Sequence, residues 1–223
     1  MSAMAGAAAT LADDRARALA LVDVSRETRE RLDRFVDLLL TWQRRINLIA
    51  PSTVGEVWTR HIADSLQLLA LAPRARTWID LGAGGGLPGL PIACALTAPA
   101  VVHLVESNAK KAAFLREAVR VTGAPAEVHL ARIEAFAAAF QGEADVVTAR
   151  ALAPLATLIG YVEPFVKRGA QALLLKGQDV AGELTDASKY WKIDADLVPS
   201  RTDSRGRIVV IRSVARAVDA GAA

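Results

Sequence analysis

Cysteine is nearly absent from this sequence, which holds one, Cys94, among 223 residues. A single cysteine excludes an intrachain disulfide and any zinc site built from several cysteines. The neighbours of Cys94 within residues 92–96 are apolar, so we expect a buried structural thiol. Such sparing use of cysteine suits a protein of the reducing cytoplasm.

Long apolar runs and targeting signals are absent as well. No stretch approaches the roughly 20 apolar residues that span a bilayer. The N-terminal residues Met1 to Thr10 are rich in alanine but lack a basic start before a leucine-rich core, so they make a poor signal peptide. We therefore expect a cytoplasmic protein without membrane contact. The net charge of +3 is compatible with a nucleic-acid partner but does not require one.

The first third of the chain is patterned as helix. Between Glu27 and Asn47 apolar residues recur with a period near 3.6, and a similar pattern returns between Val54 and Leu69. These two segments predict a pair of helices ahead of Pro73.

After Pro73 short, continuously apolar strands alternate with helices. The expected strands cover residues 78–81, 101–105, 127–130, 145–148, 172–175 and 207–212, with a seventh around Val198. Strands of this kind are typical of a mostly parallel sheet covered by helices on both faces, so the sequence predicts an α/β fold. The expected divisions are a disordered or frayed segment at 1–24, a helical extension at 25–72, an α/β domain at 73–214 and a tail at 215–223.

The strongest chemical signal is a glycine-rich turn at residues 80–89, Asp-Leu-Gly-Ala-Gly-Gly-Gly-Leu-Pro-Gly, between the first expected strand and the next helix. Glycine permits positive φ and lets backbone N–H groups approach a ligand closely. A helix that starts near Pro88 also directs the positive end of its dipole toward the turn. Ligands of doubly wound folds bind at the carboxyl ends of the strands, where this turn must lie.

An acidic residue follows the second expected strand. Glu106 stands 24 residues after Gly82, close to the offset at which a carboxylate accepts the ribose hydroxyls of a bound nucleotide. The alternative is an exposed loop acid. Together with the glycine turn, Glu106 favours a ligand that contains ribose.

Two ligand classes compete for this turn. Residues 84–89 formally match the Gly-x-Gly-x-x-Gly pattern of dinucleotide-binding enzymes. Pro88 and Pro91, however, remove N–H donors from the helical turn that would hold a pyrophosphate. Asp80 at the end of the strand, beside Gly82, suits a ligand with an amino group, and S-adenosylmethionine carries an ammonium group. We therefore favour S-adenosylmethionine over a dinucleotide.

Seven short segments stand in a fixed order between residues 30 and 213. They are Trp42-Gln-Arg-Arg-Ile-Asn-Leu48, Arg60-His-Ile-Ala-Asp-Ser-Leu66, the turn at 80–89, Val105-Glu-Ser-Asn-Ala-Lys-Lys111 with Phe114-Leu115, Arg132-Ile-Glu134, Ala149-Arg-Ala151 and Leu175-Lys-Gly177. Arg-His-x-x-Asp-Ser-Leu ahead of such a turn is not a general methyltransferase pattern. In this order the chain resembles the bacterial small-subunit ribosomal RNA guanine-N7 methyltransferases, also called the glucose-inhibited division protein B family.

The resemblance implies a Rossmann-like class I S-adenosylmethionine-dependent methyltransferase fold, and methyl transfer to N7 of a guanine in 16S ribosomal RNA. By position, Gly82 and Leu87 match cofactor contacts of the turn. Ile133 and Glu134 match a pair beside the adenine, and Arg150 matches an arginine that closes the site. The expected cofactor-binding residues are Asp80, Gly82, Gly84, Leu87, Glu106, Ile133, Glu134 and Arg150.

Two positions of the turn depart from the family pattern. Ala83 stands where Thr or Ser is usual, and Gly85 where Ala or Pro is common, which predicts a lost hydroxyl contact and a looser loop. Guanine N7 carries an in-plane lone pair, so its methylation needs no general base and depends on alignment with the sulfonium methyl. We therefore assign no catalytic acid or base and no metal.

Basic side chains on the expected helices and strand ends are candidates for contact with RNA. They are Arg44, Arg45, Arg60, His61, Lys110, Lys111 and Lys176. Each has an ordinary alternative as a solvated charge, and His61 has one as a packing residue. Arg150 has an alternative as a structural partner of Asp145 or a similar acid.

The resemblance makes 16S ribosomal RNA or the small ribosomal subunit the expected partner of a monomeric enzyme. Two other functions stay open: a methyltransferase of the same fold that acts on a small molecule or protein, and a non-catalytic ribosome-assembly factor. The intact Gly82, Gly84 and Glu106 argue against the second.

Overall fold

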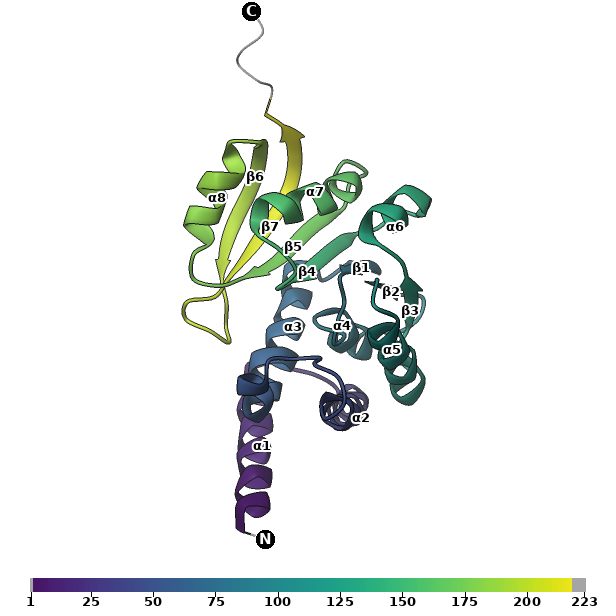
Figure 1. Ribbon diagram of the computed structural model, residues 1–223, viewed down its shortest axis with the longest axis vertical. Coiled ribbons are helices and arrows are strands. Elements are labelled where there is room, and N and C mark those ends of the chain that lie inside the picture. The colour runs from purple at the N-terminus through teal and green to yellow at the C-terminus, as the bar shows by residue number, and fades with distance from the viewer. Residues whose placement is uncertain (1, 218–223) are drawn as a thin grey trace, which may run out of the picture.

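A seven-stranded sheet forms the centre of the molecule (Figure 1). The computed structural model describes the backbone of residues 2–217 and the side chains of residues 10–217. The strands are β1 (Thr77–Leu81), β2 (Val101–Glu106), β3 (Ala126–Leu130), β4 (Val146–Arg150), β5 (Gln171–Lys176), β6 (Trp191–Pro199) and β7 (Arg207–Arg216). Their order is β3-β2-β1-β4-β5-β7-β6. Strands β1 to β5 run parallel to one another, whereas β7 is antiparallel to both β5 and β6.

Helices cover both faces of this sheet (Figure 1). One face carries α2 (Arg26–Gln43), α4 (Gly89–Ala95) and α5 (Ala109–Thr122), and the other carries α6 (Ile133–Ala139), α7 (Leu155–Val166) and α8 (Val180–Ser188). The neighbouring residues Trp78 and Ile79 belong to the cores on opposite faces. Because successive side chains of a strand alternate between faces, both positions must be apolar. The predicted α/β fold, with a mostly parallel seven-stranded sheet, is confirmed.

Local signals fix where the main helices begin and end. The Ser25 hydroxyl accepts a hydrogen bond from the N–H of Thr28 at 3.1 Å and caps α2. The Asn108 side chain accepts the N–H of Lys110 at 2.9 Å and caps α5. Gly123, with φ +62°, ends α5 in the left-handed conformation that glycine adopts without strain.

The strand order reverses at β1, which pairs with β2 on one side and β4 on the other. Crossovers leave this point in opposite directions, which opens a crevice at the carboxyl ends of the strands. The turn at residues 80–89, Glu106 and Arg150 all lie at these strand ends.

The N-terminal segment differs from the expectation of a disordered or frayed stretch at 1–24. Residues Ser2–Leu21 form helix α1, which extends away from the sheet (Figure 1). The buried Asp14 carboxylate accepts hydrogen bonds from the N–H of Trp58 at 2.8 Å and from the Thr59 hydroxyl at 2.6 Å. Hydrophobic periodicity did not predict α1, because the buried carboxylate of Asp14, a polar group, anchors this helix to the rest of the fold.

The second N-terminal helix predicted between Val54 and Leu69 is a series of short turns. The segments are the 3₁₀-helix η1 (Pro51–Glu56), the π-helix η2 (Trp58–Ala63), α3 (Asp64–Leu66) and the 3₁₀-helix η3 (Gln67–Leu71). Their apolar side chains share one core cluster with α2, α4 and α5. The extension is therefore packed directly onto one face of the sheet.

A C-terminal tail was expected at 215–223, but β7 continues to Arg216. Residues 218–223 lie outside the described part of the chain. Among residues 2–217, no helix has the length and apolar character needed to cross a membrane.

Asp14→Ala is expected to lower the free energy of unfolding by about 2–4 kcal/mol, because it leaves the donors at the start of η2 without their charged acceptor. Urea denaturation followed by circular dichroism measures this loss. The adjacent Asp13 is exposed, so Asp13→Ala serves as the matched control with little expected effect. Equal stability of the two variants would contradict the anchoring role of Asp14.

Candidate functional site

The glycine turn adopts a conformation that only glycine accepts easily. Gly82, Gly84 and Gly86 have φ values of +68°, +52° and +80°. The N–H of Ala83 donates to the carbonyl of Val105 at 2.9 Å, which ties the turn to the end of β2. The turn therefore presents backbone to the crevice rather than side chains.

Glu106 holds this turn from the end of β2. One carboxylate oxygen accepts the N–H of Gly84 at 2.9 Å, and the other accepts the N–H of Asn108 at 2.7 Å. Each oxygen can accept more than one hydrogen bond, so the carboxylate keeps capacity for hydroxyl donors. Both its position and its orientation are thus fixed before any ligand arrives.

Asp80 holds the other end of the turn and does not face the crevice. Its side chain is buried, and it accepts the N–H of Gly89 at 2.9 Å and the Thr148 hydroxyl at 3.1 Å. Burial raises the pKa of Asp80 to about 7, against the opposite effect of these two hydrogen bonds. The structure corrects the expected contact with a ligand ammonium group, since the carboxylate turns inward to the start of α4.

A cavity of about 290 Å³ opens beside the turn. We call it the cofactor cavity, after the ligand that the sequence predicts for the glycine turn. Its lining residues are Gly82, Gly84, Val105, Glu106, Ser107, Lys111, Ala131, Arg132, Ile133, Glu134, Arg150, Ala151, Leu152, Ala153 and Tyr161. Of the eight expected cofactor residues, all but Asp80 and Leu87 line it. Lys111, expected to face RNA, lines this cavity instead.

Four lining residues lie outside the segments quoted from the sequence: Ala131, Leu152, Ala153 and Tyr161. Leu152 lies in the loop after β4, and a Cβ atom on Gly82 would be 2.7 Å from its Cδ1 atom. Tyr161 comes from α7. Leu152 could have been predicted, because it lies just past the carboxyl end of β4. Nothing in the spacing of residues in α7 indicates that Tyr161 lines a cavity.

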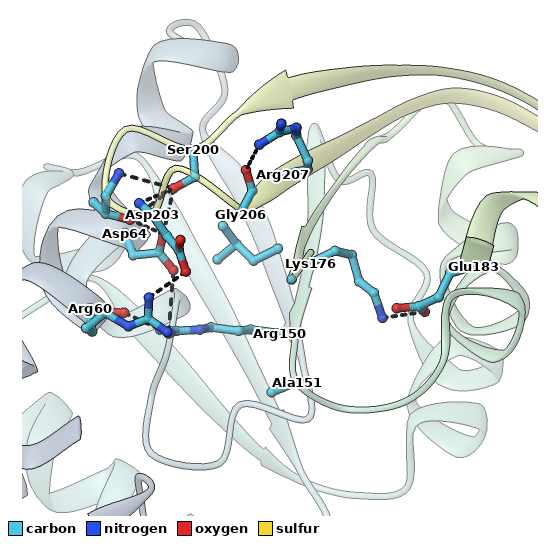
Figure 2. Close-up of a pocket in the computed structure, with 13 residues that line it drawn as sticks. Arg60, Asp64, Arg150, Ala151, Lys176, Glu183, Ser200, Asp203, Gly206 and Arg207 are labelled. Atoms are coloured by element: carbon cyan, nitrogen blue, oxygen red, sulfur yellow. Dashed lines mark hydrogen bonds and ion pairs between the residues drawn. The ribbon is translucent and has the colours of Figure 1, made fainter. Parts of the chain in front are cut away.

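Arg150 lines both the cofactor cavity and a second cavity, and Figure 2 shows it among the residues of the second cavity. Its Nη2 atom donates to the carbonyl of Arg60 at 2.7 Å and lies 3.5 Å from the Asp64 carboxylate. Within the described part of the chain, its buried Nη1 atom has no hydrogen-bond partner. Burial lowers the pKa of Arg150, while Asp64 acts in the opposite direction. The suggested partner Asp145 instead accepts backbone N–H groups at the start of β1.

The second cavity measures about 220 Å³. It is lined by Arg60, Asp64, Arg150, Ala151, Leu175, Lys176, Gly177, Glu183, Ser200, Thr202, Asp203, Gly206 and Arg207. Charges of both signs alternate around it: Lys176 pairs with Glu183 at 2.6 Å, and Arg60 pairs with Asp203 at 2.6 Å (Figure 2). Ala151 borders both cavities at φ +49°, a strained conformation for a residue with a side chain.

His61 is a packing residue rather than an RNA contact. Its side chain is buried, and its Nε2 atom lies 2.8 Å from the Thr53 hydroxyl. Burial and the nearby Arg150 lower the pKa of His61 to about 3, so the ring is neutral at pH 7. Its expected role in RNA binding is therefore corrected by its place in the core.

The remaining basic candidates divide by location. Arg44, Arg45 and Lys110 are exposed outside both cavities, and Arg60 and Lys176 line the second cavity. The structure therefore brings two of the predicted RNA-binding residues, Arg60 and Lys176, together in one cavity.

The loop after α2 lies directly against the glycine turn. The Gln43 amide oxygen accepts the N–H groups of Leu48 at 2.8 Å and Ile49 at 3.0 Å, which shapes this loop. A Cβ atom on Gly85 would lie 2.9 Å from the carbonyl oxygen of Leu48. Gly85 thus permits a close contact, which corrects the expectation of a looser turn, and Gln43 is a site-shaping residue that the sequence did not single out.

Glu106→Gln is expected to weaken binding of S-adenosylhomocysteine about 10- to 100-fold, because an amide donor would oppose one of the backbone N–H groups and lose a hydroxyl acceptor. Isothermal titration calorimetry measures the affinity. Glu143→Gln, a change of the same kind at an exposed residue outside both cavities, is the control. Unchanged affinity in Glu106→Gln would remove Glu106 from the cofactor site.

Solved structures with low sequence identity share the fold. A putative O-methyltransferase from Klebsiella pneumoniae is 13% identical, with a TM-score of 0.58 over 90% of this chain and 96% of that chain. An O-methyltransferase from Bacillus cereus, solved in complex with S-adenosylhomocysteine, is 16% identical, with a TM-score of 0.55 over 79% of this chain and 90% of that chain. The expected class I methyltransferase fold is confirmed.

Relatives with high identity identify the family. The ribosomal RNA small subunit methyltransferase G of Bradyrhizobium sp. (strain BTAi1) is 61% identical, covering 94% of this chain and 96% of the relative. The protein of the same name from Nitrobacter hamburgensis is 59% identical, covering 92% and 80%. The family model GidB, described as rRNA small subunit methyltransferase G, matches residues 28–207. The chain therefore belongs to the rRNA small subunit methyltransferase G family.

Proposed function

We propose that this chain transfers the methyl group of S-adenosylmethionine to N7 of a guanine in 16S ribosomal RNA of the small ribosomal subunit. The observation that carries the proposal is the pair of cavities that share Arg150 and Ala151 at the carboxyl ends of the strands. One cavity contains the acidic and backbone groups that suit a nucleoside, and the other is lined by charged groups of both signs. Family membership supplies the RNA substrate.

In this proposal the cofactor cavity holds the cofactor along the ends of β1, β2 and β4. Glu106 accepts the ribose hydroxyls, and Ile133 and Glu134 lie beside the adenine at the start of α6. The backbone of Gly82 and Gly84, together with Arg150, would hold the methionine part of the cofactor. When bound, S-adenosylmethionine supplies an electrophilic methyl group on a sulfonium.

The second cavity receives the target guanine. Guanine presents N–H donors on its Watson–Crick edge and the N7 lone pair on the opposite edge. Carboxylates at Asp64, Glu183 and Asp203 offer acceptors for those donors, so the base is held with N7 free. The same carboxylates stabilise the positive charge that N7 acquires. Orientation supplies the catalysis, and no residue has to remove a proton.

The surface around the cavities offers cations for the RNA backbone. Arg44 and Arg45 are exposed at the start of the loop that lies against the glycine turn, and Lys110 is exposed at the start of α5. We propose that these side chains contact phosphates, and that the chain acts as a cytoplasmic monomer on the small subunit.

Small subunits from a strain that lacks this gene, incubated with the chain and labelled cofactor, are expected to gain N7-methylguanine at one position of 16S RNA. Asp64→Asn should lower methyl transfer about tenfold or more, because the base loses a charged acceptor, while cofactor affinity, which depends on Asp64 only through its contact with Arg150, should fall much less. Asp13→Asn, at an exposed residue of α1, is the control. Label found only in protein, or in no product, would overturn the proposed function.

Charge reversal of Arg44 and Arg45 to Glu is expected to weaken binding to small subunits and to reduce the steepness of its salt dependence by about one to two released counterions. Filter binding across a salt series measures both quantities. A double reversal at Lys189 and Lys192, which are exposed outside both cavities, supplies a control of equal charge. If both double variants lose affinity equally, the effect reflects net charge rather than a contact.

A further inference from the structure

Three metal-ligating side chains meet on the sheet face under α6, outside both cavities. His103 lies on β2, and the parallel register pairs it with Glu127 of β3. His129 follows two residues later on β3 and therefore projects from the same face. The methyl-transfer site uses none of the three.

The ligand atoms of this cluster, which we call the His–Glu–His cluster, converge on one point. His103 Nδ1 lies 3.0 Å from His129 Nε2, and the nearer Glu127 carboxylate oxygen lies 3.4 Å and 3.9 Å from these two nitrogens. A tetrahedral zinc ion with bonds of about 2.0–2.1 Å separates its ligand atoms by about 3.4 Å. The three distances bracket that value, so an ion fits after shifts of a few tenths of an ångström.

The three side chains are of kinds that bind a metal ion, and solvent can reach the cluster. Neutral imidazoles offer nitrogen lone pairs to a metal. The Glu127 side chain is 62% exposed, which leaves a path from solvent to the cluster.

We propose that the His–Glu–His cluster binds one zinc ion, with two imidazole nitrogens, one carboxylate oxygen and a water in the fourth position. Two nitrogen ligands and one carboxylate form an established zinc donor set. The ion takes the place of the proton between the two facing imidazole nitrogens. That proton moves to the outer nitrogen of its own ring, so both rings stay neutral, and the ion balances the charge of Glu127.

Such an ion would cross-link the edge strand β3 to β2 beneath α6. The Phe136 ring of α6 lies 4.8 Å from the His129 ring, and Phe140 lies 5.1 Å from the His103 ring, between ring centroids. The first residues of the same helix, Ile133 and Glu134, line the cofactor cavity. The zinc ion therefore has a structural role that extends to the wall of that cavity.

Zinc chloride titrated into the tag-free, metal-stripped full chain at neutral pH tests the proposal. We expect one zinc per chain by calorimetry, and a melting temperature higher by about 5–10 °C when zinc exceeds its Kd about 100-fold. Competing soft donors are few, because the chain holds three histidines and one cysteine, and His61 and Cys94 are buried. Cobalt chloride should give the visible absorption of a four-coordinate cobalt ion.

Glu127→Gln and His129→Gln should weaken zinc binding about 10- to 100-fold or more, whereas Glu143→Gln, at an exposed acid outside the cluster, should bind as the parent does. Because Glu127 is exposed, its variant is expected to fold even if the His129 variant does not. Absence of zinc binding to the folded parent at high micromolar metal, or equal binding in Glu127→Gln, would overturn the proposal and leave a hydrogen-bonded histidine pair. Both outcomes are independent of methyl transfer.

Discussion

Two carboxylates at the ends of neighbouring strands fix the shape of the glycine turn. Asp80 accepts the N–H of Gly89 from inside the fold, and Glu106 accepts the N–H of Gly84 from the side of the crevice. The first sets where α4 begins, and the second sets where the turn faces a ligand. The turn carries positive φ at three glycines, and these two carboxylates, one from its first residue and one from β2, hold its backbone.

The N-terminal extension is part of the same site. It supplies Arg60 and Asp64 to the second cavity, and Arg150 of β4 is bonded to the carbonyl of that same arginine. The loop shaped by Gln43 lies against Gly85 of the turn. The extension thus contacts both the second cavity and the glycine turn, and separating it from the sheet would remove part of one cavity wall and one contact of the turn.

The sequence predicted the features that depend on hydrophobic periodicity and on position at the end of a strand. All seven strands and the cofactor-cavity positions of Gly82 and Glu106 follow from those two regularities. Features that depend on tertiary contacts were predicted wrongly from the sequence. Asp80 turns inward because a helix start needs its acceptor, and α1 is held by the buried Asp14. Residues that approach the site from outside a motif, such as Tyr161, carry no local signal.

The most direct measurement of the central claim is a crystal structure of the chain with S-adenosylhomocysteine. We expect the ribose hydroxyls within hydrogen-bond distance of Glu106, the adenine beside Ile133, and the sulfur directed past Arg150 toward the second cavity. A ligand seated in the second cavity, or one whose sulfur points away from Arg150, would contradict the shared wall between cofactor and guanine.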